Sequence, residues 1–354
     1  MKIIFAASPT IAIPSLEVLC GIEGIEIAGV LTNPDTPKGR HRNPLPTEIG
    51  QAADKIKETK NINFPVLKLE KLDAAAREQI SSLKPDILVS FAYGRIFGPK
   101  FLSLFPFGGI NIHPSLLPKY RGPTPVQAAI LNRDTETGIT IQLLAKEMDQ
   151  GDIIAQETLP LTGKETTQTL SETVSYKAAL MLRDTLIRIE KANGHLRANL
   201  WFDTLDKPRA QDNSAASYCH LISREDGIIN WNQSAQEIEA KIRAYDPWPL
   251  CRTIHNGREL FILEASLQGD RVYSVPLYSV HSVPLQGVHS VPLRGSTVGQ
   301  VLGIDKQYGI LIMTGGGILA VTQLQYQAKK ALYWRDFLNG ARDFTGPGTV
   351  LLGS

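Results

Sequence analysis

The feature that most constrains the fold is an alternation, in the first half of the chain, of apolar strand-length runs with helical patterns. The strand-like runs are Lys2–Ala6, Ile25–Thr32, Asp86–Phe91, Gly109–His113, Gly138–Leu144 and Asp152–Leu159. The helical patterns are Ile13–Cys20, Leu72–Leu83 and Thr166–Lys191. Strands that alternate with helices predict βαβ units and a mostly parallel sheet covered on both faces. We therefore expect an α/β, Rossmann-like domain over residues 1–191.

The second half of the chain has a different pattern, with short strand-like runs separated by glycine turns. A polar stretch at 192–216 is expected to be a linker, and Ser234–Ala244 fits a short amphipathic helix. The strand-like runs that follow are Glu259–Ala265, Thr297–Ile304, Gly309–Met313 and Ile318–Gln323. Short strands of this kind predict a small β-barrel, which we expect to be OB-like, over residues 217–354.

One segment within this second domain repeats with a period of eight residues. The copies Val272–Leu277, Val280–Leu285 and Val288–Leu293 share Val-x-Ser-Val-Pro-Leu. The proline in each copy removes a donor from any β ladder, and loops tolerate added length. We therefore favour a duplicated loop insertion at 272–295 without a role of its own. The alternative is a peptide- or metal-binding tract that uses His281 and His289.

Composition limits the class of protein. The chain has 37 Lys and Arg against 35 Asp and Glu, a net charge of +2, which argues against a histone-like protein but permits a local basic patch for RNA. Its three cysteines form no C-x-x-C, as expected of a protein from a reducing compartment without a zinc site. No apolar run approaches the roughly 18 residues of a membrane span. We expect a cytoplasmic monomer without membrane segments.

A polar pair ends one of the predicted strands. Asn111 and His113 are two residues apart, so their side chains share one face of the strand, and Pro114 then turns the chain out of the sheet. Open α/β sheets bind ligands at the carboxyl ends of parallel strands. The spacing alone leaves two interpretations open: a ligand site, or a satisfied histidine beside a turn asparagine.

A carboxylate follows a later predicted strand. Asp149 comes after Gly138–Leu144, and Gly151 suits a tight turn there. A carboxylate near His113 would fix the tautomer of the imidazole and raise its basicity. The alternative is an ordinary aspartate at a turn.

The residues around this pair resemble the folate-dependent formyltransferases. The resemblance rests on the run Asn111–Pro118, on Tyr120-Arg121-Gly122 and on the stretch from Gly138 to Asp149. The second half is similar to the carboxyl-terminal domain of those members that act on methionyl-tRNA, and Thr32–Arg40 resembles their inserted basic loop. The residues that carry the similarity in the second half are Ile229-Asn230-Trp231, Ile242–Tyr245 and Pro247-Trp248-Pro249. Only the octad insertion lies outside the resemblance.

The resemblance implies transfer of the formyl group of 10-formyltetrahydrofolate to the α-amino group of initiator methionyl-tRNA, for translation initiation. It implies that Asn111, His113 and Asp149 are catalytic and that no metal takes part. Such a transfer passes through an oxyanion, which preorganised donors stabilise. Two alternatives are a sugar-nucleotide N-formyltransferase and a non-catalytic folate- or RNA-binding protein. The basic loop and Pro247-Trp248-Pro249 argue against the first, and the catalytic trio argues against the second.

The resemblance also implies two binding surfaces. Folate is expected against Ser115, Leu116, Leu117 and Pro118 and against the loop of Tyr93, Gly94, Arg95, Ile96 and Phe97. Ordinary core packing is the alternative for these residues. For the tRNA, the basic loop offers Lys38, Arg40 and Arg42, and the second domain offers Lys329 and Lys330. The alternative for the loop is a solvated surface. The first strand ends in Ala6-Ala7-Ser8-Pro9, without the usual glycine, so no phosphate cradle is expected there.

Overall fold

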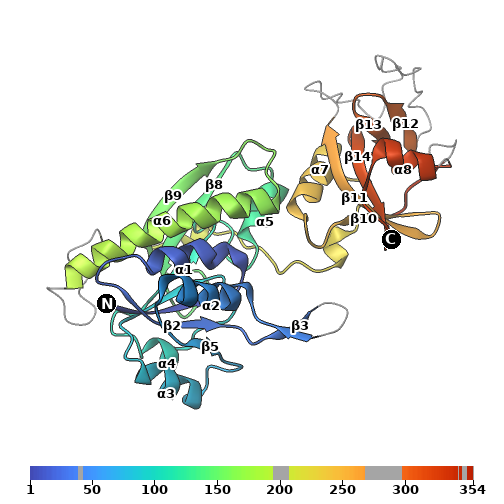
Figure 1. The fold of residues 1–354 in the computed structure, drawn as a ribbon. Helices are drawn as coiled ribbons and strands as arrows, with labels where there is room; N and C mark the ends of the chain where they lie inside the picture. Colours follow the sequence, from blue (N-terminus) through green and yellow to red (C-terminus); the bar gives the residue numbers. More distant parts are fainter. Residues whose placement is uncertain (39–42, 194–206, 268–296, 342, 345–348, 354) are drawn as a thin grey trace. The chain divides into compact units, whose positions relative to one another are not determined.

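The structure of the chain is a computed structural model that describes residues 1–38, 43–193, 207–267, 297–341, 343–344 and 349–353 (Figure 1). The octad insertion, Arg40 and Arg42 lie outside these residues. The chain divides into two compact units. Unit 1 comprises residues 1–129, 135–162 and 169–221, and unit 2 comprises 130–134, 163–168 and 222–354. No helix in the described part of the chain combines the length and apolarity that a membrane crossing requires.

Unit 1 is built on a seven-stranded sheet. From one edge to the other, its strands are β5 (Val66–Lys68), β2 (Glu26–Thr32), β1 (Lys2–Ala7), β6 (Ile87–Phe91), β7 (Gly109–His113), β8 (Glu136–Leu143) and β9 (Ile153–Pro160). The first five are parallel, whereas β8 pairs antiparallel with both β7 and β9. This confirms the expected α/β class with a mostly parallel sheet.

Helices connect and cover these strands. They are η1 (Thr10–Ala12), α1 (Ile13–Leu19), α2 (Glu48–Lys60), α3 (Ala74–Ser82), α4 (Pro99–Leu102), α5 (Pro125–Leu131) and α6 (Thr167–Asn193). Helix α3 begins at Ala74, two residues later than the predicted helical pattern of Leu72–Leu83. The Asp73 side chain accepts a hydrogen bond from Ala76 N at 3.1 Å, which caps the helix there.

The core of unit 1 lies on the sheet. Ile4 and Ala6, which share one face of β1, pack in a cluster with Ile80 of α3 and Phe101 of α4. The intervening Phe5 is also fully buried, on the other face. Burial on both faces explains why β1 is apolar throughout instead of alternating. The long helix α6 lies in front of the sheet in Figure 1.

The polar segment before unit 2 packs on unit 1. Of the stretch 192–216 that composition assigns to a linker, the structure describes Ala192, Asn193 and 207–216. Residues 207–221 belong to unit 1 and contain the 3₁₀ turn η3 (Asn213–Ala215). Arg209 bridges the edge strand β9 at Ile153 through two backbone hydrogen bonds of 2.8 and 2.9 Å. A segment that reads as a spacer is therefore part of the first compact unit.

Unit 2 contains a six-stranded antiparallel sheet. Its strands run in the order β10 (Cys251–His255), β11 (Arg258–Leu267), β14 (Ile318–Tyr326), β13 (Gly309–Met313) and β12 (Val301–Asp305), and β15 (Leu332–Tyr333) pairs with β14. The helical elements are η4 (Glu225–Gly227), α7 (Ala235–Ala244) and α8 (Trp334–Gly340). Ser234 and Glu237 form a capping box at the start of α7.

The end of the chain joins the two edges of this sheet. Leu352 exchanges backbone hydrogen bonds of 2.9 and 3.0 Å with Ile254 of β10. On the opposite edge, Val301 N donates to Thr349 O at 2.9 Å, and Val350 bridges Gln300. The edge strands β10 and β12 are thus both paired with residues 349–352, which reduces the exposed backbone at the sheet edges.

Candidate active site

The predicted polar pair lies at the carboxyl end of β7. Asn111 and His113 face the same side of the sheet, and the register of β8 sets Gln142 opposite Asn111 and Thr140 opposite His113. Residues that are paired across two strands project to the same face. Two amide side chains and one imidazole therefore gather at this strand end.

Both ring nitrogens of His113 have neighbours. Only 4% of the residue is exposed, and Nε2 lies 2.8 Å from the backbone oxygen of Tyr120. A carbonyl oxygen only accepts hydrogen bonds, so this contact assigns a proton to Nε2. The other nitrogen, Nδ1, lies 3.5 Å from Asp149 Oδ1. The structure thus brings Asp149 to the imidazole and leaves Nδ1 as the nitrogen available for chemistry.

The Asp149 carboxylate is held on both oxygens. Oδ1 accepts from Gln142 Nε2 at 3.0 Å, and Oδ2 accepts from the backbone N–H of Gly122 at 2.9 Å. Its side chain is 11% exposed. Gly122 has a φ of +116°, and a Cβ there would lie 2.4 Å from the Cys219 carbonyl oxygen. Only glycine fits at the position that supplies this donor.

Backbone strain is concentrated around the same strand ends. Asp149 has a φ of 56°, Tyr120 of 59° and Ala92 of 51°, which is the left-handed region that non-glycine residues seldom adopt. Each such residue costs on the order of 1 kcal/mol or more, and such strain is typical of functional sites. Here it fixes the direction of the Asp149 carboxylate and of the Tyr120 carbonyl that faces His113.

Asn111 is the member of the trio without a fixed partner. Its side chain is partly exposed, and its amide group makes no hydrogen bond within the part of the chain that the structure describes. An amide of this kind has two N–H donors to offer a ligand. The strand end therefore combines a free donor, a buried imidazole and a fixed carboxylate, the groups needed to stabilise an oxyanion and to move a proton.

The turn after β7 is rigid. Thr140 Oγ1 donates to Ser115 O at 2.7 Å and accepts from Leu117 N at 3.1 Å, while Gln156 Nε2 donates to Leu117 O at 3.0 Å. Ser115 and Leu117 are buried, and Leu116 and Pro118 are partly exposed. The backbone groups of Leu117 are thus engaged inside the protein. A ligand at this turn meets the partly exposed side chains instead.

The loop after β6 divides into buried and exposed residues. Tyr93 and Phe97 are 2% and 5% exposed, and their rings stack at 5.3 Å within the core of unit 1. Burial raises the pKa of the Tyr93 hydroxyl. Arg95 Nη1 braces the loop by donating to Leu69 O at 2.9 Å, and Gly94 and Ile96 lie at the surface, Ile96 with 65% exposed. Core packing accounts for the two aromatic rings.

Of the predicted basic loop, the structure describes the residues on either side of 39–42. The strands β3 (Thr36–Lys38) and β4 (Asn43–Leu45) pair antiparallel on either side of it. Asn33 Nδ2 donates to Ser8 Oγ and to Tyr93 O, each at 2.9 Å, and thereby ties the start of the loop to the ends of β1 and β6. Lys38 lies on β3, and Arg40 and Arg42 lie outside the described residues.

Three contributors to the site were not identified from the sequence. They are Gln142, the Gly122 N–H and the Tyr120 carbonyl. Gln142 carried a signal, because it lies on a predicted strand two residues from Thr140 and so shares its face. The two backbone groups carried none, since every residue has an N–H or a carbonyl and only the fold selects which of them faces the site.

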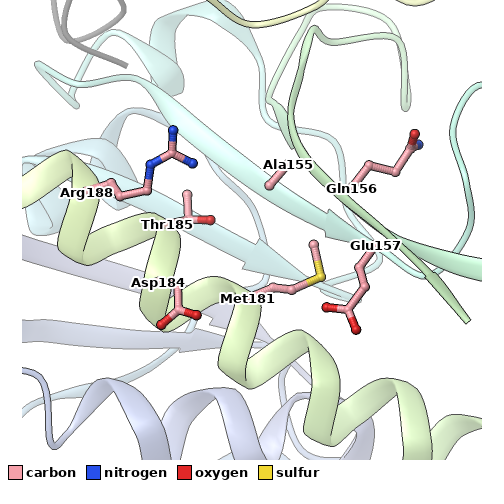
Figure 2. Close-up of a pocket in the computed structure, with 7 residues that line it drawn as sticks. All are labelled: Ala155, Gln156, Glu157, Met181, Asp184, Thr185 and Arg188. Carbon is pink, nitrogen blue, oxygen red and sulfur yellow. The ribbon is translucent and has the colours of Figure 1, made fainter. Parts of the chain in front are cut away.

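A separate hollow of about 270 Å³ lies between β9 and α6. Figure 2 shows strand residues on one side of it and helix residues on the other. Its lining is Ala155, Gln156, Glu157, Met181, Asp184, Thr185 and Arg188. None of the residues predicted for catalysis or ligand contact lines it. Among the described residues, no group of three or more His, Cys, Asp and Glu side chains has the arrangement of a metal site.

Two family models match the chain. One, described as formyl transferase, matches residues 2–186, and the other, described as formyl transferase, C-terminal domain, matches residues 221–342. A relative from Treponema denticola, named methionyl-tRNA formyltransferase, is 43% identical over 350 residues, which cover 98% of this chain and 99% of the relative. A protein of the same name from Roseiflexus castenholzii is 37% identical over 97% of this chain and 96% of its own length.

A solved structure has a similar fold. It is an N-formyltransferase from Helicobacter canadensis, in complex with folinic acid and dTDP-3-aminofucose. It is 20% identical to this chain with a TM-score of 0.57, and the match covers 91% of this chain and 99% of that protein. At this identity the similarity concerns the fold alone.

Proposed function

Because this chain belongs to the formyl transferase family, we propose that it transfers the formyl group of 10-formyltetrahydrofolate to the α-amino group of methionyl-tRNA, in translation initiation. The observation that supports the chemistry is the convergence of Asn111, His113 and Asp149 at one strand end, with His113 Nδ1 3.5 Å from Asp149 Oδ1. Near full-length similarity to proteins named methionyl-tRNA formyltransferase supports the acceptor.

The reaction forms a bond between the formyl carbon and the acceptor nitrogen and breaks the bond between that carbon and N10 of the folate. One proton passes from the acceptor amine to the leaving nitrogen. 10-Formyltetrahydrofolate supplies the formyl group when it is bound. The free amide of Asn111 donates to the formyl oxygen, where negative charge develops as the amine attacks. His113, protonated on both ring nitrogens, contributes a second, charge-assisted donor through Nδ1, while its Nε2–H donates to the Tyr120 carbonyl.

Asp149 orients His113 and accepts the amine proton, directly or through a water molecule. Its two fixed hydrogen bonds, from Gln142 and Gly122, hold the carboxylate toward the imidazole before any substrate arrives. The entropy of arranging these groups is therefore lost on folding and not during the reaction.

For the folate, we propose the surface formed by the turn Ser115–Pro118 and the loop Tyr93–Phe97. The partly exposed Leu116 and the exposed Ile96 and Gly94 supply contact area. Tyr93 and Phe97 support the loop from the core. An apolar wall with a few polar groups suits a planar ring system.

For the tRNA, we propose contacts from Lys38, Arg40 and Arg42 and from unit 2. Exposed Lys329 and Lys330 lie between β14 and β15. We propose that unit 2 is an OB-like barrel, on the basis of its antiparallel sheet and of the chain end that pairs with both edges. In this assignment residues 1–191 are catalytic, 192–216 connect the domains and 217–354 bind RNA, while the contacts of residues 207–221 place that segment in unit 1. We also propose a cytoplasmic monomer.

The test is a formylation assay that offers 10-formyltetrahydrofolate with either methionyl-tRNA or an amino-sugar nucleotide. Formylation of methionyl-tRNA with no product from the sugar nucleotide supports the proposal. Turnover of the sugar nucleotide alone would select the sugar-nucleotide alternative. Binding of folate and tRNA without turnover of either acceptor would leave a non-catalytic binding protein.

A further inference from the structure

A buried arginine lies close to the candidate catalytic aspartate. Arg121 is 1% exposed, yet no Asp or Glu of the described residues forms an ion pair with it. Its guanidinium donates instead to neutral oxygens. Nε and Nη2 reach Gln211 Oε1 at 3.1 and 2.7 Å, Nη2 reaches Asn213 Oδ1 at 2.8 Å, and Nη1 reaches the Tyr218 hydroxyl at 3.2 Å. Every partner comes from the segment 207–221.

Gln211, which Arg121 holds, forms hydrogen bonds to the turn that carries Asp149. Because arginine only donates, the atom that faces Arg121 is the amide oxygen of Gln211, and its Nε2 must point the other way. Nε2 donates to Gly151 O at 2.7 Å and to Asp149 O at 2.9 Å. One side chain thus fixes the carbonyls on both sides of Gln150. A side chain at Gly151 is excluded, since its Cβ would lie 1.8 Å from Leu143 O.

A second route leads from Gln211 to the carboxylate itself. Gln211 Nε2 also lies 3.2 Å from Gln142 Oε1, and Gln142 Nε2 donates to Asp149 Oδ1 at 3.0 Å. The contact from Gln211 therefore fixes which end of the Gln142 amide faces Asp149. The chain of donors runs from the guanidinium of Arg121 through two amides to the carboxylate, and each link polarises the next.

We propose that Gln211, anchored by Arg121, is a positioning residue for Asp149, so that the segment after α6 completes the active site of unit 1. The inference rests on the proposed function, because it gives Gln211 no task unless Asp149 acts in formyl transfer. Residue 211 lies beyond the first matched family region, which ends at residue 186. A unit that ended with α6 would keep Asn111, His113 and Asp149 but lose the support of the carboxylate.

Two substitutions separate the support of Asp149 from the satisfaction of Arg121. Gln211→Ala removes both, and leaves the buried guanidinium short of an acceptor, which destabilises the fold. Gln211→Glu keeps an acceptor for Arg121 but replaces the amide donor with a carboxylate oxygen that repels the two carbonyls. Gln79→Ala, at an exposed position of α3, is the matched control. Melting temperature is recorded for each variant.

We expect both Gln211 variants to lose roughly 10- to 100-fold in kcat, because a displacement of about 1 Å in a catalytic group has effects of this size. The KM values for methionyl-tRNA and for 10-formyltetrahydrofolate should stay near those of the parent, as should the kcat of Gln79→Ala. Gln211→Glu should melt closer to the parent than Gln211→Ala does. A Gln211→Glu variant with the parent kcat overturns the inference.

A double-mutant cycle with Asp149→Asn measures whether the effect of Gln211→Ala on the rate depends on the Asp149 carboxylate. A purely structural role of Gln211 would give no such dependence. Measured in single turnovers with enzyme in excess, Gln211→Ala should cost less than about twofold once the carboxylate is gone. An equal loss with and without the carboxylate would show that Gln211 acts elsewhere and would overturn the inference. Parent-like turnover of Asp149→Asn would instead refute the proposed function. An inactive Asp149→Asn with a fully active Gln211→Glu would refute only the positioning role.

Discussion

The two units each bury an arginine, and they satisfy it in opposite ways. Arg121 of unit 1 is 1% exposed and meets only neutral oxygens, from Gln211, Asn213 and Tyr218. Arg252 of unit 2 is 7% exposed and forms an ion pair with Glu259, from Nε to Oε1 at 3.0 Å. The positive charge is cancelled in place in unit 2, whereas in unit 1 it stays uncancelled beside a network that ends on Asp149.

The different partners of the two arginines indicate a different role for each. An ion pair such as that of Arg252 holds two strands in register, because it joins β10 to β11. A buried cation without a carboxylate partner is costly for folding and is tolerated where function requires it. Because Arg121 donates to the amide oxygen of Gln211, the amide nitrogen of Gln211 faces the turn of Asp149. In our proposal, the hydrogen bonds of Arg121 to neutral partners anchor Gln211 beside the candidate active site.

The largest effect should come from the trio itself. His113→Ala or Asp149→Ala should lower kcat by roughly two to three orders of magnitude while tRNA binding stays near that of the parent, because oxyanion and proton-transfer support is lost. His255→Ala is the matched control in unit 2, since His255 is also buried and bonds the Tyr326 hydroxyl at 2.6 Å. It should lower the melting temperature but not the kcat. Near-parent turnover of His113→Ala would contradict the mechanism.

Arg252→Met tests whether the buried ion pair with Glu259 stabilises the fold of unit 2. Glu259 would keep Arg224, whose Nη2 lies 3.1 Å from Oε1, so the loss should fall somewhat below the usual cost of breaking a buried pair, at about 2–3 kcal/mol. Urea unfolding of the variant measures it. We expect the kcat of formyl transfer to be retained. A large fall in kcat at unchanged stability would break the comparison.

Arg121→Met tests whether the buried arginine of unit 1 supports turnover by holding Gln211. The anchor of Gln211 is lost, so kcat should fall by about tenfold, equivalent to about 1.4 kcal/mol in the activation barrier. Removing the uncancelled cation also removes its desolvation cost, so the fall in stability should be smaller than for Arg252→Met. Parallel urea unfolding and turnover of the two variants provide the check. Equal loss of stability with unchanged kcat would show that both arginines serve the fold alone.

A smaller effect is expected at the basic loop. Arg40→Ala should weaken the use of methionyl-tRNA without changing the affinity for the folate, because its predicted contact is with phosphate. The slope of log affinity against log salt concentration should then fall by about one. Relaxed discrimination among tRNAs would indicate base contact instead. Parent kinetics with every tRNA would remove the loop from the RNA-binding surface.

The smallest effect should follow deletion of the octad insertion, 272–295. It falls between β11 and β12, which are separated in the sheet by β14 and β13. Residues 268–271 and 296–300 and a short linker remain to span that distance, so folding and formylation should be preserved. Melting temperature and activity on methionyl-tRNA are measured together. A large drop in melting temperature would show that the repeats pack on unit 2. Lost tRNA affinity at unchanged stability would show that they bind RNA.

The sequence predicted the elements whose burial leaves a local pattern. Alternating strand-like and helical segments indicated the parallel part of the unit 1 sheet, and Asn111 and His113 were expected on one face because residues two apart on a strand share a face. The amphipathic pattern of Ser234–Ala244 predicted α7, which the structure places at Ala235–Ala244. Each of these signals lies within a few residues of the chain, so periodicity and spacing are enough to detect it.

The tertiary structure decided which distant groups meet. Gln211 lies 62 residues from Asp149 and 90 from Arg121, within a polar stretch that composition assigns to a linker. The contact of Tyr120 O with His113 Nε2, which leaves Nδ1 as the nitrogen proposed to act in catalysis, involves a backbone group that every residue possesses. Polar residues have no periodic signal, and a hydrogen bond between remote segments depends on how apolar faces pack to bring them together. The sequence therefore singled out Asp149 and His113 as candidates, and the packing of the chain determined that they meet and what holds them in place.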